Sequence, residues 1–209
     1  MSVAPVVAGS GPKPDGERRF LIHGISWEQY EALRELLDSA GLRITYLEGA
    51  LELMSPSRLH EHSKKLIARL VEAYAHELGL PLNGYGSTTF RKRAKERGAE
   101  PVECYMLGVA PPLDDNDTPP HIALEVVITR SGLDKLSVYA GLEVPELWLW
   151  DGERFSLQAL QGGAYVATAC SHFLPDLDFE LLGRYVQERD QAAAVRAFVD
   201  ELRRRMRTP

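Results

Sequence analysis

The stretch His121-Ile-Ala-Leu-Glu-Val-Val-Ile128 decides the fold that we expect for this chain. It is almost wholly apolar, which is typical of a strand that is buried on both faces of a sheet. A short helical pattern follows at about 133–142, and 144–150 again has the composition of a strand. Strand, helix and strand in this order predict at least one parallel pair, because parallel neighbours need a crossover connection.

Toward the N-terminus, the sequence predicts a helix followed by a β-hairpin. Ser26 and Gln29 form a capping-box pattern, which starts a helix. The runs 42–48 and 50–54 both alternate between apolar and polar residues, and Gly49 separates them. Two alternating runs around a glycine are typical of a hairpin.

A long helix and several strands complete the predicted elements. Ser57 is placed to cap a helix whose apolar stripe continues to about residue 78. The other expected elements are strands around 87–90, 101–107, 155–160 and 165–168 and a helical region at 185–207. Together they predict an α/β fold with a central mixed β-sheet flanked by helices.

Length and composition favour one domain with short appendages. The chain has 209 residues, which is enough to bury a full core without disulfides or metals. We expect a flexible N-terminal arm at 1–19, the main domain at 20–188, and a C-terminal helix with a basic tail at 189–209. The formal net charge of −6 counts against tight, nonspecific DNA binding but does not exclude a metal-dependent nuclease.

Several classes of protein are not indicated. The first residues lack a basic start and a sustained apolar run, so no secretory signal is expected. No apolar run is long enough to span a membrane. The two cysteines, Cys104 and Cys170, are too few for a disulfide framework or a four-cysteine zinc site. These observations favour a cytoplasmic protein.

Glu125 is the exception in the apolar strand and the first candidate for a functional residue. A buried carboxylate is costly unless it is paired or binds a metal, so a salt bridge and a metal site are both open interpretations. Glu103 lies in the preceding predicted strand, and the two carboxylates would supply oxygen ligands for Mg²⁺ if they faced one another. Lys135 follows on the short helix, either to position a water molecule or simply as a solvated residue.

The order and spacing of several short motifs resemble a known family. These motifs are Tyr46–Gly49, Leu51–Pro56, Glu61-His62, Glu100-Pro101, Ile122–Val127, Asp134–Leu136 with Tyr139 and Gly141, and Val144–Trp148. In this order they resemble the small, single-domain restriction endonuclease family, long listed as a domain of unknown function, of the PD-(D/E)XK nuclease superfamily. The resemblance covers about residues 26–160.

The resemblance implies a restriction-endonuclease-like fold and hydrolysis of DNA phosphodiester bonds with Mg²⁺ or Mn²⁺. The second acid of the family falls on Glu125, and its lysine moves from position 127, a valine here, to Lys135. An acid on the long helix, Glu61, is drawn into the same metal site. The catalytic set is therefore expected to be Glu103, Glu125 and Lys135, with Glu125, Glu103 and Glu61 binding the metal.

One position departs from the family pattern. Relatives read Pro-Asp where this chain has Pro101 and Val102, and that Asp is their first metal ligand. Glu103 comes one place later, and successive residues of a strand point to opposite faces, so Glu103 replaces the Asp only through a bulge. The alternative function is therefore a catalytically inactive nuclease fold that serves as a binding or assembly module.

Two further features concern partners. Arg91, Lys92, Arg93 and Lys95 form a basic cluster that would contact DNA phosphates or would lie in solvent at a hairpin tip. Trp148 and Trp150 alternate on one strand and belong either to the core or to the interface of a homodimer.

Overall fold

The strand centred on Glu125 lies in the middle of a six-stranded mixed sheet. In the computed structural model, which describes residues 16–37, 41–112, 114–115 and 118–207, it is β8 (Ile122–Val126). It pairs in parallel with β9 (Glu146–Trp150) and antiparallel with β7 (Glu103–Leu107). The predicted parallel pair is confirmed. The sheet order is β11-β10-β9-β8-β7-β4, with β4 at Leu82–Gly84, β10 at Phe155–Gln161 and β11 at Ala164–Thr168.

A second sheet of five antiparallel strands packs beside the first, whereas the sequence predicted a single sheet. Its order is β1-β3-β2-β6-β5. The strands are β1 (Arg18–His23), β2 (Arg43–Leu47), β3 (Ala50–Ser55), β5 (Phe90–Lys92) and β6 (Arg97–Ala99). The predicted hairpin is β2–β3, and its turn residues Glu48 and Gly49 both have positive φ. The strand expected around 87–90 is wrong except for Phe90.

The N-terminal region differs from its expected form where the structure describes it. Residues 18 and 19, assigned to the arm from sequence, belong to β1, which pairs along β3 from Arg18–Ser55 to His23–Ala50. This strand carried no clear alternation, so the sequence did not indicate it. Residues 1–15 of the expected arm lie outside the described residues.

The helices begin where their capping residues predict. The side chains of Ser26 and Gln29 exchange hydrogen bonds with each other's backbone N–H at the start of α1 (Trp27–Leu37). Ser57 accepts a hydrogen bond from the backbone N–H of His60 at the start of α2 (Arg58–Glu77). The other helices are α3 (Lys135–Gly141), α4 (Phe179–Val186), α5 (Gln191–Arg207) and the single 3₁₀ turn Arg93–Lys95. The helical region expected at 185–207 is thus two helices.

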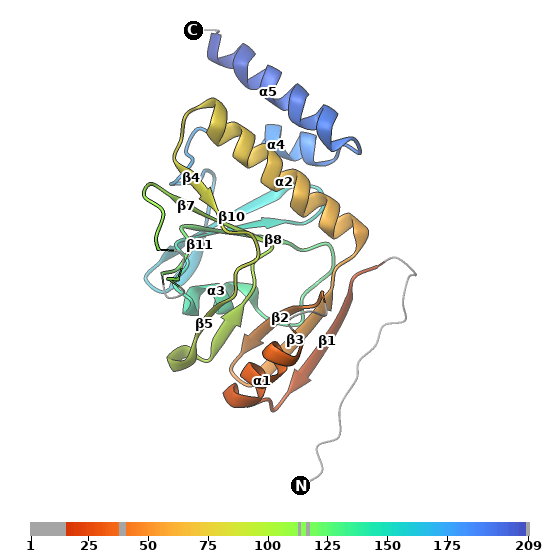
Figure 1. Cartoon of the computed structure of the whole chain (residues 1–209), viewed down its shortest axis with the longest axis vertical. Helices are drawn as coiled ribbons and strands as arrows, with labels where there is room; N and C mark the ends of the chain where they lie inside the picture. The colour runs from red at the N-terminus through yellow and green to blue at the C-terminus, as the bar shows by residue number, and fades with distance from the viewer. Residues whose placement is uncertain (1–15, 38–40, 113, 116–117, 208–209) are drawn as a thin grey trace.

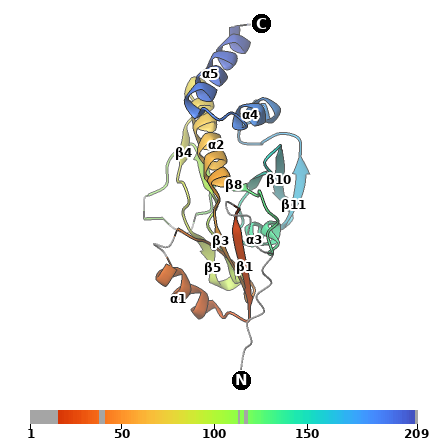
Figure 2. The ribbon, with the colours of Figure 1, turned by 90° about the vertical axis from the view of Figure 1, so that its right-hand side faces the viewer.

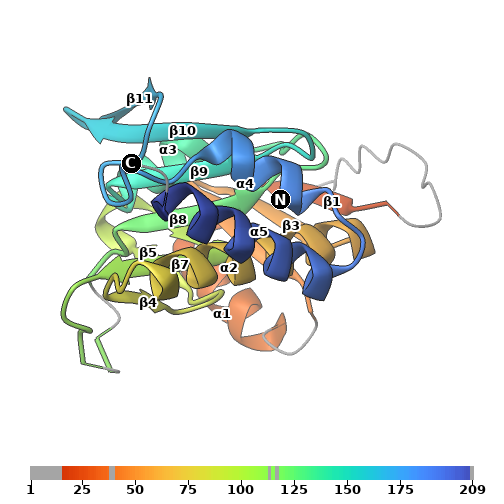
Figure 3. The ribbon, with the colours of Figure 1, turned by 90° about the horizontal axis from the view of Figure 1, so that it is seen from above.

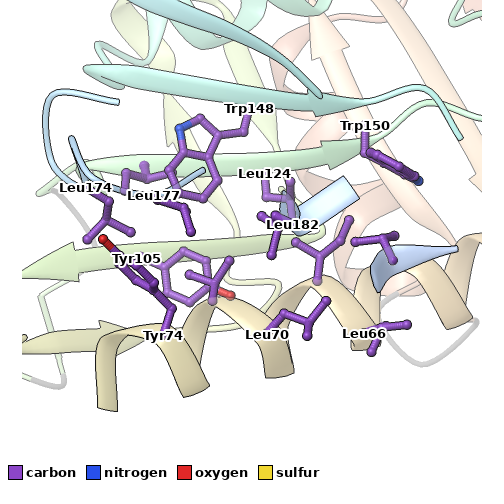
Figure 4. Close-up of a cluster of buried hydrophobic side chains, with 14 of the residues drawn as sticks. Leu66, Leu70, Tyr74, Tyr105, Leu124, Trp148, Trp150, Leu174, Leu177 and Leu182 are labelled. Atoms are coloured by element: carbon purple, nitrogen blue, oxygen red, sulfur yellow. The ribbon is translucent and has the colours of Figure 1, made fainter. Parts of the chain in front are cut away.

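Helices cover both faces of the six-stranded sheet. Helices α2, α4 and α5 cover one face and form the main apolar cluster with β7, β8 and β9 (Figures 1 and 3). Trp148 and Trp150 belong to this cluster and are 0% and 1% exposed, so they are core residues (Figure 4). On the other face, α3 packs through Val138 and Tyr139 and also contacts β2 and β6 of the second sheet.

The five-stranded sheet has its own apolar cluster beneath α1, at the end of the molecule opposite α5 (Figure 2). Tyr30 and Tyr46 stack at 4.7 Å between ring centroids, and Trp27 meets both rings edge-on. A Cβ at Gly98 would lie 2.1 Å from the Tyr30 hydroxyl oxygen, so this position needs glycine. Among the described helices, none combines the length and apolarity that a membrane span requires.

Candidate functional site

Glu125 lies on the face of β8 that α3 covers, and it is 3% exposed. Its Oε1 atom accepts a hydrogen bond of 2.6 Å from the Tyr139 hydroxyl and one of 3.2 Å from Lys135 Nζ. Burial and the neighbouring Glu125 raise the pKa of Tyr139 well above its usual range, so this phenol stays protonated and donates. Lys135 on the short helix therefore contacts Glu125, the residue with which it was grouped from the sequence.

Lys135 is also tied to the second sheet. Its Nζ atom donates a 2.8 Å hydrogen bond to Thr45 Oγ1 on β2, and its side chain is 14% exposed. Asp134 caps α3 by accepting from the backbone N–H of Leu136, which places Lys135 at the first position of the helix. The lysine therefore bridges the two sheets.

Glu52 is a buried acid that the sequence analysis missed. It is 2% exposed, lies opposite Thr45 in the register of β2 and β3, and forms a 2.7 Å ion pair with Arg19. It also accepts hydrogen bonds from the Ser131 hydroxyl and the Gly132 N–H. Its alternation with Leu51 and Leu53 placed it on one strand face, but nothing local indicated that this face would be covered.

Glu103 is not brought to Glu125, although their strands are neighbours. The register pairs Glu103 with Leu124, and directly opposed residues share a sheet face. Leu124 belongs to the cluster under α2, so Glu103 lies on the α2 side, away from Tyr139. Burial raises the pKa of Glu103, and the positive charge of Lys64 opposes this effect.

Val102 also belongs to the α2-side apolar cluster. It is 0% exposed, and its backbone N–H donates to the Leu124 carbonyl. The position at which the resemblance implies a first metal-binding acid is therefore filled by an apolar side chain in the core.

Glu61 forms a separate polar group at the start of α2. Its Oε1 atom lies 3.2 Å from His60 Nδ1 and 3.9 Å from Arg43, and nearly half of its side chain is exposed. His60 is completely buried, and burial lowers its pKa. Glu61 and Arg43 line a pocket of about 420 Å³ together with Glu100, and among the described residues no hydrogen bond or ion pair joins this group to Glu125.

The basic cluster surrounds the β5–β6 turn, and most of its charges are paired with acids. Arg91 lies 3.9 Å from Glu31, Lys92 lies 2.6 Å from Glu143, and Arg93 pairs with Glu28. For Lys95, no acidic group comes within ion-pair distance in the part of the chain that the structure describes. The cluster lies at a hairpin, as one of the two interpretations of the sequence expected, and three of its four basic residues face acids. Its contact with DNA stays a prediction.

The arrangement supplies one carboxylate where a metal site was expected. Within the described residues, no group of three or more His, Cys, Asp or Glu side chains is placed to hold a metal ion. Glu125 meets a lysine and a tyrosine, Glu103 lies on the opposite face, and Glu61 is held by His60 and Arg43. These residues do not fit a Mg²⁺ or Mn²⁺ site, which needs several oxygen ligands at one point.

Comparison with known proteins identifies a family for this chain. The model of the family described as "Uma2: Putative restriction endonuclease" matches residues 27–187. Among solved structures, this chain is similar to one titled "a putative nuclease belonging to DUF820 from Anabaena variabilis ATCC 29413". The TM-score is 0.41 and the sequence identity 10%, over 75% of this chain and 90% of that chain. No curated protein matches the chain.

Proposed function

Because this chain belongs to the restriction endonuclease family whose model matches residues 27–187, we propose that it hydrolyses phosphodiester bonds of DNA at Glu125 and Lys135. The observation that supports the proposal is the pairing of these two residues at 3.2 Å at the end of a central strand. Lys135 keeps 14% of its side chain exposed against 4% for Glu125, so the lysine is the member that a phosphate reaches.

The chain's own residues would prepare this lysine for a phosphate. Glu125 and Thr45 hold the ammonium group from two sides, which limits its rotation and keeps its charge at one place. A positive charge that is already oriented stabilises a developing phosphorane more strongly than a mobile one. Mg²⁺ or Mn²⁺, the ions expected from sequence, would supply an activated water molecule when bound. The described residues do not complete a site for these ions.

The second candidate function is DNA binding or assembly without hydrolysis. The observation that favours it is Val102, which is fully buried among apolar side chains at the position where the resemblance implies an acid. Under this candidate the pair of Glu125 and Lys135 joins the two sheets and has no chemical role.

The same proposal includes contact between DNA and the basic cluster of Arg91, Lys92, Arg93 and Lys95. The cluster lies at an exposed turn, and a phosphate would have to compete with Glu28, Glu31 and Glu143 for three of its four charges. We therefore expect DNA binding to be weak and to fall with salt. A homodimer and a cytoplasmic location stay predictions, and the first is tested by sedimentation equilibrium.

Plasmid nicking in the presence of Mn²⁺ or Mg²⁺ tests the proposal. The variants are Glu125→Gln and Lys135→Met, with Glu103→Gln as the matched control, since Glu103 is a carboxylate on the adjacent strand but on the opposite face. We expect the first two to lose about 100-fold or more of the activity, the scale for an electrostatic catalytic group, and the control to retain it. Loss of activity in Glu103→Gln alone would contradict the assignment.

A parallel binding measurement separates the two candidate functions. If the purified protein binds DNA but does not nick it with either metal ion, the result would support the inactive module. Nicking that Glu125→Gln removes, with unchanged DNA affinity, would support the endonuclease.

A further inference from the structure

A pocket of about 750 Å³ opens on the α2 side of the six-stranded sheet, on the face opposite Glu125. We propose that it binds a 5′-phosphorylated nucleotide, either free or as the end of a DNA strand. This inference does not depend on hydrolysis. The volume lies within the range of small-molecule sites. The pocket is lined by Arg58, Leu59, His62, Ser63, Trp150, Gly152, Glu153, Val186, Gln187 and Arg189.

A buried hydrogen-bond donor in this lining has no partner. Trp150 is 1% exposed, and its Nε1–H finds no acceptor among the described residues. The neighbouring Trp148 differs, because its indole donates to Glu146. In Figure 4 the nitrogen of Trp150 points away from the leucines and tyrosines of the core. A buried N–H without an acceptor is costly, so an acceptor supplied by a ligand accounts for it.

The rim of the pocket is positively charged. Arg58 and Arg189 are exposed, and within the described part of the chain neither forms an ion pair or a side-chain hydrogen bond. Glu153 is the single acid among the lining residues. His62 is already used, since its Nε2 lies 2.9 Å from the Glu188 carbonyl. Two free guanidinium groups favour a phosphate, which they can bind through paired N–H donors.

The backbone near the pocket also favours a phosphate. Arg58 and Leu59 belong to the first turn of α2, a helix of 20 residues, where unpaired N–H groups and the helix dipole attract anions. Trp150 ends β9, and its carbonyl accepts from the Val127 N–H just past β8. The pocket therefore lies at the carboxyl ends of the parallel strands, where α/β proteins commonly bind ligands.

The floor of the pocket is apolar, which selects among phosphates. Leu59 supplies most of this surface, because it is 56% exposed, whereas Val186 and Trp150 line the pocket at only 2% and 1% exposure. Inorganic phosphate would leave this surface uncovered. A nucleoside monophosphate covers it with the sugar and base while the arginines hold the phosphate.

Nuclear magnetic resonance tests the proposal directly, because the chain has only three tryptophans and so three indole N–H signals. The probe is thymidine 5′-monophosphate, titrated into the full-length ¹⁵N-labelled protein, with Trp150→Phe used to assign the signal. We expect the Trp150 signal to move downfield with saturation. The Trp27 indole, which also lacks a partner but lies in another cluster, should not move.

The variants Arg58→Gln and Arg189→Gln measure the contribution of the rim. Each should weaken binding about tenfold, the scale of one charge-assisted hydrogen bond. The matched control is Arg154→Gln, since Arg154 is 86% exposed on the turn next to the pocket and already faces Asp151 at 3.7 Å. This control should bind as the wild type does.

Two comparisons identify the source of the phosphate and two results would overturn the proposal. Stronger binding of a 5′-phosphorylated than a 5′-hydroxyl oligonucleotide points to a DNA end, and binding of the mononucleotide alone points to a free nucleotide. An unmoved Trp150 signal at millimolar nucleotide overturns the site. So does equal binding of thymidine and its monophosphate. Neither result depends on a nuclease assay, so nucleotide binding can be tested even if the protein does not hydrolyse DNA.

Discussion

Glu125 and Glu103 are carboxylates on adjacent strands of one sheet, yet their surroundings differ completely. Glu125 faces α3 and receives hydrogen bonds from Lys135 and Tyr139. Glu103 faces α2, where burial raises its pKa, and the charge of Lys64 and backbone hydrogen bonds at Gly86 and Cys104 only partly oppose the shift. The strand register pairs Glu103 with Leu124, so the side chains of Glu103 and Glu125 point to opposite faces of the sheet. The cost of burying a carboxylate is thus offset by side-chain hydrogen bonds on one face of the sheet and only partly offset on the other.

The largest expected effect comes from placing a charge on the poorly compensated face. Val102→Asp would put a carboxylate into the apolar cluster under α2, and we expect a loss of about 3–5 kcal/mol in the free energy of unfolding. The measurement is urea unfolding of the wild type, Val102→Asp and Val102→Asn. The Asn variant is the control, because Asn has nearly the shape of Asp without its charge. A variant that instead gained Mn²⁺-dependent nicking at unchanged stability would show that position 102 faces Glu125.

Removing the partner of Glu125 should cost slightly less. Lys135→Met leaves the carboxylate with Tyr139 as its hydrogen-bond donor, and we expect a loss of about 3 kcal/mol at pH 7. The double variant Lys135→Met/Glu125→Gln should recover most of this loss, because no buried charge remains. If the double variant is as unstable as the single one, packing and not charge explains the effect.

Neutralising Glu103 should have the opposite sign. The pKa of Glu103 is raised in the folded state, so the neutral acid contributes stability below its ordinary pKa of about 4.5. This stability is lost as the pH rises through the pKa of the folded state. Glu103→Gln should therefore unfold with a higher free energy than the wild type at pH 7, on the order of 1 kcal/mol. At pH 3.5 the two should approach each other. Chemical denaturation at both pH values is the measurement, and a variant less stable at pH 7 would mean that Lys64 compensates the charge fully.

The smallest effect is expected at a surface ion pair. Arg93 and Glu28 form such a pair with about two thirds of each side chain exposed. Arg93→Gln should change the free energy of unfolding by less than about 0.5 kcal/mol, because water screens the pair. Thermal melting at low and high salt checks this. A shift as large as that of Lys135→Met would remove the contrast between buried and exposed pairs.

The central elements were predictable because their signals are local. Capping at Ser26 and Ser57 starts two helices where expected, and the apolar stretch around Glu125 forms the predicted buried strand. The link between Lys135 and Glu125 was also within reach, since a short crossover helix must return over the strand it leaves.

What the sequence by itself determined is therefore the mixed sheet, its parallel pair and the unusual Glu125. Only the tertiary structure decided which carboxylates meet. Side chains alternate along a strand, so a register shift of one residue moves Glu103 to the other face, and no local pattern fixes that shift. The ion pair of Glu52 with Arg19 and the unpaired indole of Trp150 likewise depend on segments far apart in the chain. Whether a polar atom finds a partner is a property of packing, and composition alone does not contain it.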